Sequence, residues 1–288
     1  MHVTGVTPRL LSARSAERPI KLRDGRILLP TYGYAADADF ACGSHRTGEA
    51  EDRCYTVFVF SAAHPDTDPT AWTYESRIDH TSAMSAKGMT VSGPCEPAVV
   101  QLPGSDDRVL SVFRVQSFAG HWGAMSTDGA RSWGLPFPTG TWAVSPNLLA
   151  LNSGAVVLTS GRPGIGLWLA NFANHKSTDT SPEWTFHNVA TAHNKGISVA
   201  ALRYPDVDAE VSNASSHDSA YIVNAANPYG SPDMNHASST AYTGLLALDN
   251  ETLLLSYDRL ASGWAGPPGR LGDEDFVFAM RVTVKRAL

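Results

Sequence analysis

The chain has 288 residues, a formal net charge of −6, 17% charged residues and no cluster of Lys or Arg. The lack of a basic patch argues against nucleic acid as a partner, and no apolar run approaches the roughly 20 residues that a membrane-spanning helix needs. Seven Trp, 24 Gly and 18 Pro, without a long amphipathic helix, suit many short strands joined by turns.

The first predicted hairpin follows residues 1–17, which we interpret as an irregular lead-in or an incomplete first strand. Ile20–Leu22 and Ile27–Leu29 are apolar runs separated by an Arg-Asp-Gly turn, and Arg18 precedes them. The N-terminal stretch has basic residues but no continuous apolar segment, so it does not predict a signal peptide. The compartment stays open.

A long polar loop, Tyr32–Arg53, follows this hairpin and contains Asp37, Asp39 and Asp52. Loops of this length inside a compact domain are usually functional or disordered, and its place beside charged hairpin ends favours function. The next run, Tyr55–Phe60, is nearly all apolar, which predicts a strand buried on both faces.

The three cysteines are Cys42, Cys54 and Cys95. Their odd number and the lack of metal-ligand spacing favour free thiols, and no metal site is predicted. A Cys42–Cys54 disulfide would require export of the chain after removal of a leader.

The second hairpin carries charges where its strands begin and end. Ala98–Leu102 and Val109–Phe113 flank a polar loop, with Glu96 before the first run and Arg114 after the second. Because the start of one antiparallel strand lies beside the end of the other, Glu96 and Arg114 should emerge at one edge of the sheet.

Two further hairpins have polar residues at the same ends. Asn147–Leu151 and Ala155–Leu158 are followed by Arg162. Thr243–Leu248 and Thr252–Ser256 are preceded by Tyr242 and followed by Asp258. The region before this last hairpin is less clear, with Val199–Leu202 and Tyr221–Val223 as candidate strands, and Phe276–Val284 is the predicted closing strand.

The four hairpins are separated by one or two multiples of about 45 residues, which is the spacing of propeller blades. We therefore predict an all-β fold, a six-bladed β-propeller of four-stranded antiparallel blades, as a single domain over residues 1–288. In a propeller the corresponding ends of the inner strands converge near one mouth of the channel, where distant residues share a pocket.

At these residues the sequence resembles the sialidase (exo-α-neuraminidase) superfamily. Ser126–Trp133, with the sequence STDGARSW, is similar to the Asp box S-x-D-x-G-x-T-W, with Ala130 at the usual glycine and Ser132 at the usual threonine. The Cys-Glu-Pro segment at Glu96, the hairpin end at Arg114, the Ser-Gly-Arg-Pro-Gly segment at Arg162 and the tyrosine segment at Tyr242 resemble the family's pocket segments. Glu17-Arg18-Pro19-Ile20 stands where the family has R-I-P, and Asp258 stands where it usually has glutamate.

The resemblance implies roles for these residues. Arg18, Arg114 and Arg162 would bind a substrate carboxylate through charge-assisted, often bidentate hydrogen bonds. Tyr242 would be the nucleophile, a choice that avoids repulsion between two carboxylates. Three acidic residues would assist, namely Glu96 as the base for Tyr242, Asp52 as acid and then base, and Asp258 as the group that orients Arg18.

The implied function is a retaining exo-glycosidase that releases terminal sialic acid from a sialylated or other acidic glycan, without a cofactor. Asp37 and Asp39 remain alternatives to Asp52 as the acid/base. Two rival functions also remain open, because a fold does not determine a function. One is a propeller glycosidase or lyase acting on another acidic sugar such as a uronate, and the other is a non-catalytic carbohydrate-binding propeller.

Overall fold

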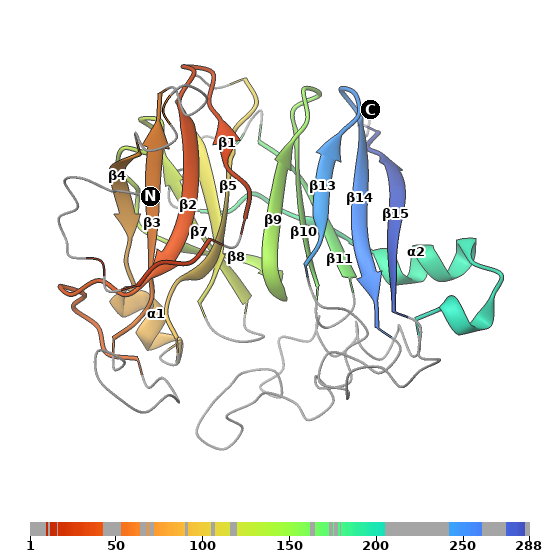
Figure 1. Ribbon diagram of the computed structural model, residues 1–288, viewed down its shortest axis with the longest axis horizontal. Helices are drawn as coiled ribbons and strands as arrows, with labels where there is room; N and C mark the ends of the chain where they lie inside the picture. The colour runs from red at the N-terminus through yellow and green to blue at the C-terminus, as the bar shows by residue number, and fades with distance from the viewer. Residues whose placement is uncertain are drawn as a thin grey trace. The chain divides into compact units, whose positions relative to one another are not determined.

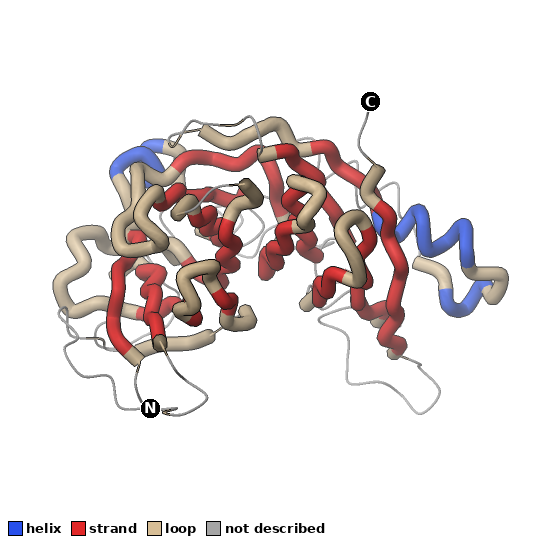
Figure 2. The backbone as a smooth tube through the Cα atoms, turned by 90° about the horizontal axis from the view of Figure 1, so that it is seen from above, coloured by secondary structure: helices blue, strands red, loops and turns tan. Residues whose placement is uncertain are grey.

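The computed structural model is built from antiparallel β-sheets, with few helices among the residues that it describes (Figures 1 and 2). The described residues are 10, 12–15, 17–42, 53–63, 68, 72–89, 92–104, 107–115, 120–161, 165–172, 175, 178, 180–204, 242–260 and 275–285. No helix in this part of the chain is long and apolar enough to cross a membrane.

The chain divides into two compact units. Unit 1 comprises Met1–Gln116, His121–Gly140 and Lys176–Ser181. Unit 2 comprises Ser117–Gly120, Thr141–His175 and Pro182–Leu288. Each unit is described by itself below.

The first sheet belongs to unit 1 and has the order β1-β2-β3-β4. Its strands are β1 (Ile20–Lys21), β2 (Ile27–Gly33), β3 (Thr56–Ala62) and β4 (Thr73–Ile78). Every residue of β3 is buried, so the predicted strand with two buried faces is confirmed. A short helix, α1 (Ser82–Ala86), follows β4, and its first turn is capped by the Thr81 hydroxyl, which accepts the Met84 N–H.

The second sheet has the order β5-β6-β7-β8 and lies in unit 1, except for the first residue of β7 and the last two residues of β8. Its strands are β5 (Cys95–Gln101), β6 (Val109–Arg114), β7 (Gly120–Ser126) and β8 (Phe137–Trp142). The predicted hairpin is confirmed as β5 and β6, with Ala98 paired to Val112 and Gln101 paired to Val109. Buried apolar residues of the two sheets, among them Val57, Val99 and Phe113, share one core cluster.

Unit 2 contains the third sheet, of order β12-β11-β10-β9, and the three-stranded fourth sheet, of order β13-β14-β15. The third consists of β9 (Val144–Ala150), β10 (Ala155–Gly161), β11 (Ile165–Asn171) and β12 (Thr185–Asn188). The fourth consists of β13 (Gly244–Ala247), β14 (Thr252–Arg259) and β15 (Phe276–Thr283), and Figure 1 shows its strands side by side in blue. The predicted third and fourth hairpins and the late strand are therefore confirmed.

Two short helical elements in unit 2 come after β12, namely α2 (Val189–Gly196) and the 3₁₀ helix η1 (Ala200–Leu202). The prediction of a strand over Val199–Leu202 is therefore wrong. An apolar run this short fits either a strand or a helical turn, and here Val199 accepts the Leu202 N–H within the run itself. The other candidate strand, Tyr221–Val223, lies outside the described residues.

The hairpins repeat one turn geometry, which puts their residues in register. The residue directly after each first strand is a leucine whose N–H donates to a carbonyl at the first residue of the second strand or at the residue before it, at 2.8 to 2.9 Å. These leucines are Leu22, Leu102, Leu151 and Leu248. Equivalent residues in different hairpins can therefore be found by counting from the turn.

The Asp box lies between β7 and β8 and is held by its own side chains. The Asp128 carboxylate accepts the N–H groups of Arg131 and Ser132, at 3.0 and 2.9 Å, and the Ser132 hydroxyl at 2.6 Å. Within unit 1 the box also joins the two sheets, because the Trp133 indole N–H donates to Ser76 of β4 at 2.9 Å.

The alanine at the usual glycine position of the box has a left-handed backbone, with φ of 68° at Ala130. This conformation costs alanine about 1 kcal/mol relative to glycine. The Ala130 methyl group is completely buried in the unit 1 core, and burying one methyl stabilises by about 0.8 kcal/mol. The two effects nearly cancel, which explains how the box tolerates the substitution.

Two of the cysteines are not free thiols. Cys42 and Cys54 form a disulfide, whereas Cys95 is buried and free. The expectation of free thiols was wrong for Cys42 and Cys54, because the spacing of cysteines in a sequence does not show which chain segments lie side by side. Here Ala41 and Arg53, the residues before the two cysteines, pair in an antiparallel bridge.

Candidate functional site

The candidate site in unit 1 is built on a β-bulge at the start of β5. The register with β6 shifts between Cys95, which pairs with Arg114, and Ala98, which pairs with Val112. Glu96 and Pro97 therefore oppose one residue, and Glu96 has a φ of 49°. A left-handed glutamate before a proline is a strained conformation of the kind that clusters at functional sites.

The bulge brings the Glu96 carboxylate to Arg114, with 2.8 Å between Glu96 Oε1 and the Arg114 terminal nitrogen. The side chains of Glu96 and Arg114 are 10% and 15% exposed, respectively. The pair that the sequence predicts at one sheet edge is therefore a partly desolvated ion pair.

Arg114 retains an unused donor in this environment. Its Nε atom is buried and has no hydrogen-bond partner among the described residues. Burial acts to lower the pKa of Arg114, but the neighbouring Cys95 and Glu96 outweigh it and raise that pKa above its ordinary value. Burial also raises the pKa of the Cys95 thiol to about 11, so the thiol is neutral at pH 7. The guanidinium therefore stays charged, and its buried Nε–H is a strong donor without a described acceptor.

A similar β-bulge occurs at the start of β9, where the register with β10 also shifts and Ser145 has a φ of 53°. Ser145 precedes a proline, as Glu96 does, and both stand six residues before the leucine of their turn. A serine in place of the glutamate gives this bulge no charge. The backbone bulge therefore recurs in two sheets. Of these two bulges, only the one in the second sheet carries a charged side chain, that of Glu96.

Tyr32 is a residue of this site that the sequence analysis missed. It lies on β2 five residues after Ile27, as Arg114 lies five residues after Val109, so the two occupy equivalent positions. Burial, together with the charge of Glu96, raises the pKa of Tyr32 to about 12. The Arg14 side chain acts in the opposite direction but does not outweigh them. Aligning the second strands of the hairpins, rather than only the residues next to apolar runs, would have found it.

Aromatic rings surround Tyr32. Its ring meets that of Tyr55 edge-on with centroids 5.3 Å apart, and Tyr55 stacks on Tyr34 at 4.5 Å. Arg14 also exchanges two backbone hydrogen bonds with Tyr32, at 2.7 and 2.8 Å. Glu96, Arg114, Tyr32 and Arg14 thus place charged groups next to aromatic rings in unit 1.

The first arginine, Arg18, is exposed and lies two residues before β1. It stands four residues before the leucine of its turn, whereas Glu96 stands six before Leu102, so the two are not equivalent in the repeat. Two other predicted residues, Asp52 and Arg162, lie outside the described residues.

The alternatives to Asp52 are both described. Asp37 forms an ion pair with Arg77 at 2.8 Å, and Arg77 contacts Asp79 at 2.7 Å on its other side. Asp39 is exposed and lines a small cavity of about 30 Å³ next to Arg77 and His80. Burial lowers the pKa of His80 to about 4, so its ring is neutral at pH 7.

In unit 2, Tyr242 is 56% exposed and lies two residues before β13. Gly244 pairs with Ser256, so continuing this antiparallel register sets Tyr242 opposite Asp258. In the second sheet the bulge instead sets Cys95 opposite Arg114, and Glu96 reaches Arg114 through its side chain. The neighbouring Thr243 carbonyl accepts the Asn147 side-chain N–H of β9, at 3.1 Å.

A buried network supports the strand end that carries Asp258. His193 Nε2 lies 2.9 Å from the Leu202 carbonyl, an acceptor, so this nitrogen carries the proton. His193 Nδ1 then accepts the Tyr257 hydroxyl, also at 2.9 Å, while the Tyr204 hydroxyl donates to the Asp258 carbonyl. Burial raises the pKa of Tyr257 to about 12. These groups fix the backbone on which Asp258 stands.

A larger cavity of about 650 Å³ in unit 2 contains none of the predicted residues. Glu183, His187 and Lys285 are among the residues that line it. The size of a cavity therefore does not single out the candidate site, which is identified by its buried charges.

No family model matches the sequence, and no curated protein is similar enough to match it. Among solved structures, a protein of unknown function from Dyadobacter fermentans is similar with a TM-score of 0.55 and 15% identity, over 96% of this chain and 55% of that protein. The Hadza microbial sialidase Hz136 is more distant, with a TM-score of 0.47 and 10% identity over 86% of this chain and 35% of the sialidase. An α-L-arabinofuranosidase from Fusarium graminearum gives 0.46 and 14%, over 96% of this chain and 64% of that enzyme.

The likeness to the Dyadobacter protein shows a shared fold and nothing of the chemistry. The two glycosidase likenesses are too distant to carry an argument about this chain. The chain spans about half the length of the Dyadobacter protein that it resembles. The all-β prediction is confirmed by the strand pairing, since three of the four sheets in the described residues are four-stranded and antiparallel, and the fourth has three strands.

Proposed function

We propose that the protein is a sialidase-like retaining exo-glycosidase on a six-bladed β-propeller, and that it releases a terminal acidic sugar from a glycan. The observation that carries the proposal is the buried Glu96–Arg114 ion pair with its unused Arg114 Nε donor. A buried guanidinium with a donor to spare favours a substrate that brings a carboxylate. The Asp box supports the propeller fold, and the sequence resemblance at the hairpin residues supports the choice of sialic acid.

The proposed chemistry keeps the predicted roles. Tyr242 attacks the anomeric carbon and passes its proton to Glu96, while Asp52 protonates the departing glycosidic oxygen. Asp52 then removes a proton from water, which attacks the anomeric carbon and breaks its bond to Tyr242, and Glu96 returns its proton to the departing Tyr242 oxygen. Arg18, Arg114 and Arg162 hold the substrate carboxylate, and Asp258 orients Arg18. Two inversions at one carbon give retention of configuration.

The experiment is the release of a fluorescent alcohol from an α-sialoside, with the wild-type chain and Tyr242→Phe. We expect turnover by the wild type and a loss of at least about 10³-fold in the variant, since a missing nucleophile removes the covalent path. Tyr74→Phe, at a half-buried tyrosine packed on Phe60, is the matched control and should keep full activity. A fluorinated sialyl fluoride should also leave one sialyl group on Tyr242, detected by mass spectrometry.

The other outcomes separate the rival functions. Activity on uronate oligosaccharides alone would replace sialic acid by another acidic sugar and keep the arginine pocket. Binding of a sialoside without turnover, unchanged in Tyr242→Phe, would select a carbohydrate-binding propeller. A folded chain that neither binds nor cleaves any acidic glycan would refute the proposal.

A further inference from the structure

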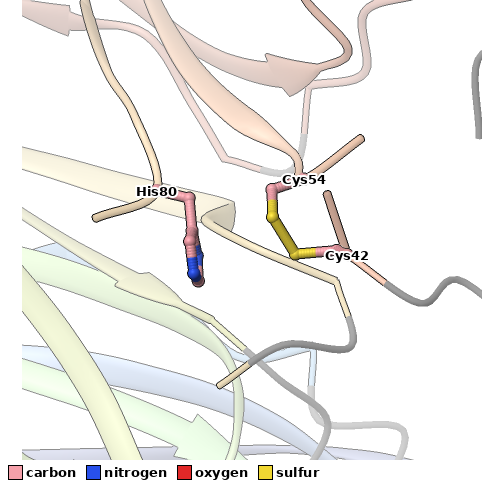
Figure 3. Close-up of side chains that lie close together, drawn as sticks. All are labelled: Cys42, Cys54 and His80. Carbon is pink, nitrogen blue, oxygen red and sulfur yellow. A yellow bond between two sulfur atoms is a disulfide. The ribbon is translucent and has the colours of Figure 1, made fainter. Parts of the chain in front are cut away.

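Cys42, Cys54 and His80 lie together in unit 1, in the part of the chain described by the structure. Each is buried, and one potential ligand atom from each lies within 4.8 Å of the other two. Figure 3 shows the His80 ring beside the Cys42–Cys54 disulfide. The proposed glycosidase chemistry uses none of these three side chains.

The His80 ring packs edge-on against Phe40, with centroids 5.3 Å apart, and its two nitrogens have different surroundings. His80 is 4% exposed, and its Nε2 lies 2.9 Å from the Ser85 hydroxyl of α1. Its Nδ1 is buried and has no hydrogen-bond partner among the described residues. A ligating histidine commonly donates its second N–H to a nearby acceptor, which fixes the tautomer and leaves the other nitrogen for the metal. Ser85 fills the role of that acceptor.

The ligand set has the chemistry of a zinc site. Two thiolates and one neutral imidazole are preferred by Zn²⁺, which often keeps a fourth position for water. The adjacent cavity of about 30 Å³ is lined by Cys54, His80, Thr56 and Asp79, and it can admit a water molecule. Two thiolates would also neutralise the ion, beside a cavity already charged by Arg77, Asp39 and Asp79.

We propose that the reduced chain binds one Zn²⁺ through Cys42, Cys54 and His80 Nδ1, so that this point of the fold exchanges a disulfide for a metal link. A water-soluble phosphine breaks the S–S bond and is oxidised to its oxide with the oxygen of one water molecule, whose two protons go to the two thiols. Zn²⁺ then binds both sulfur atoms and displaces the two thiol protons to solvent. The two sulfur atoms must move to about 3.8 Å apart, the separation set by Zn–S bonds of about 2.3 Å in a tetrahedron.

The proposal has a consequence for the segment between the cysteines. The disulfide joins residues 12 apart in sequence, and this segment contains Asp52. Either link, disulfide or zinc, ties the ends of the segment to each other, but only zinc also ties them to His80. The chain would therefore keep Cys42 and Cys54 linked in both oxidising and reducing surroundings.

The test uses the full chain, oxidised or reduced by a water-soluble phosphine, with zinc measured by competition against a chromophoric chelator. We expect one Zn²⁺ per reduced chain and none per oxidised chain. Cys42→Ser and His80→Ala should abolish stoichiometric binding, while Ser85→Ala should weaken it by about 10- to 100-fold. Cys95→Ser is the matched thiol control and His187→Ala the matched imidazole control, and both should bind zinc as the wild type does.

A readout on the unmutated chain covers variants that fail to fold. X-ray absorption of the zinc-loaded reduced chain should show two sulfur and at least one imidazole nitrogen neighbours. Failure of a folded, reduced chain to bind zinc would overturn the proposal. So would a site without imidazole, binding that survives in His80→Ala, or zinc that is lost in Cys95→Ser.

Discussion

Replacing Glu96 by alanine should be among the most destabilising single changes in unit 1. The change leaves the Arg114 guanidinium, whose side chain is 15% exposed, without its carboxylate at 2.8 Å. At this separation and an effective dielectric constant of about 20, the lost attraction is about 6 kcal/mol. Relief of the glutamate's own desolvation offsets part of this, and losing one partner of a buried pair typically costs about 3 to 5 kcal/mol.

The assay is urea denaturation followed by tryptophan fluorescence. A loss of 3 to 5 kcal/mol moves the midpoint down by about 1 M or more, with m near 3 kcal/mol/M. Combining Glu96→Ala with Arg114→Met should recover most of the stability, because an apolar pair replaces a buried ion pair at little net cost. The matched control is Asp37→Ala, which breaks an ion pair of the same 2.8 Å with its carboxylate side 54% exposed, and should cost less than about 1 kcal/mol.

Equal effects of Glu96→Ala and Asp37→Ala would refute the reasoning, since burial is the difference between the two pairs. Recovery must also come from removing the second charge. If Arg114→Met added its own destabilisation to that of Glu96→Ala, the two side chains would not be coupled, and the unused donor on Arg114 would lose its significance as a substrate contact.

Three further changes test other parts of the fold. Trp133→Phe removes the indole donor to Ser76 and should lower the free energy of unfolding by about 1 to 2 kcal/mol, measured by chemical denaturation. Ser76→Ala should give a similar loss. If the losses of the two variants added up in the double variant, the contact would be contradicted. Removing the disulfide by Cys42→Ser with Cys54→Ser should cost about 3 kcal/mol in metal-free, oxidising buffer, as expected for a loop of this length, and an unchanged thermal midpoint would contradict this. Burial acts to raise the pKa of Asp128, but the hydrogen bonds that Asp128 accepts from Ser132, Ser126 and Arg131 outweigh burial and lower that pKa below 3.8. The Asp128 carboxylate therefore contributes its full stabilisation above pH 3.8, and this is lost as the pH falls through the pKa of the folded state. Asp128→Asn should flatten the fall in stability between about pH 5 and pH 2, and an unchanged pH profile would show that the carboxylate contributes nothing through its charge.

The sequence by itself predicted the hairpins, the Asp box and the pairing of Glu96 with Arg114. These features are local, because apolar runs, turn residues and antiparallel register act within about 20 residues of chain. The all-β fold followed from the same signals. The strand prediction for Val199–Leu202 was wrong because an apolar run of this length does not distinguish a strand from a helical turn.

Only the tertiary structure decided which of these residues are buried and what lies beside them. The bulge that gives Glu96 its positive φ depends on its register with β6, and the charge of Glu96 reaches Tyr32 through packing between two sheets of unit 1. The disulfide and its approach to His80 likewise join segments that no spacing rule connects. Burial and distance across the fold set charge, pKa and ligand chemistry, and these depend on the folded chain as a whole rather than on any one stretch of it.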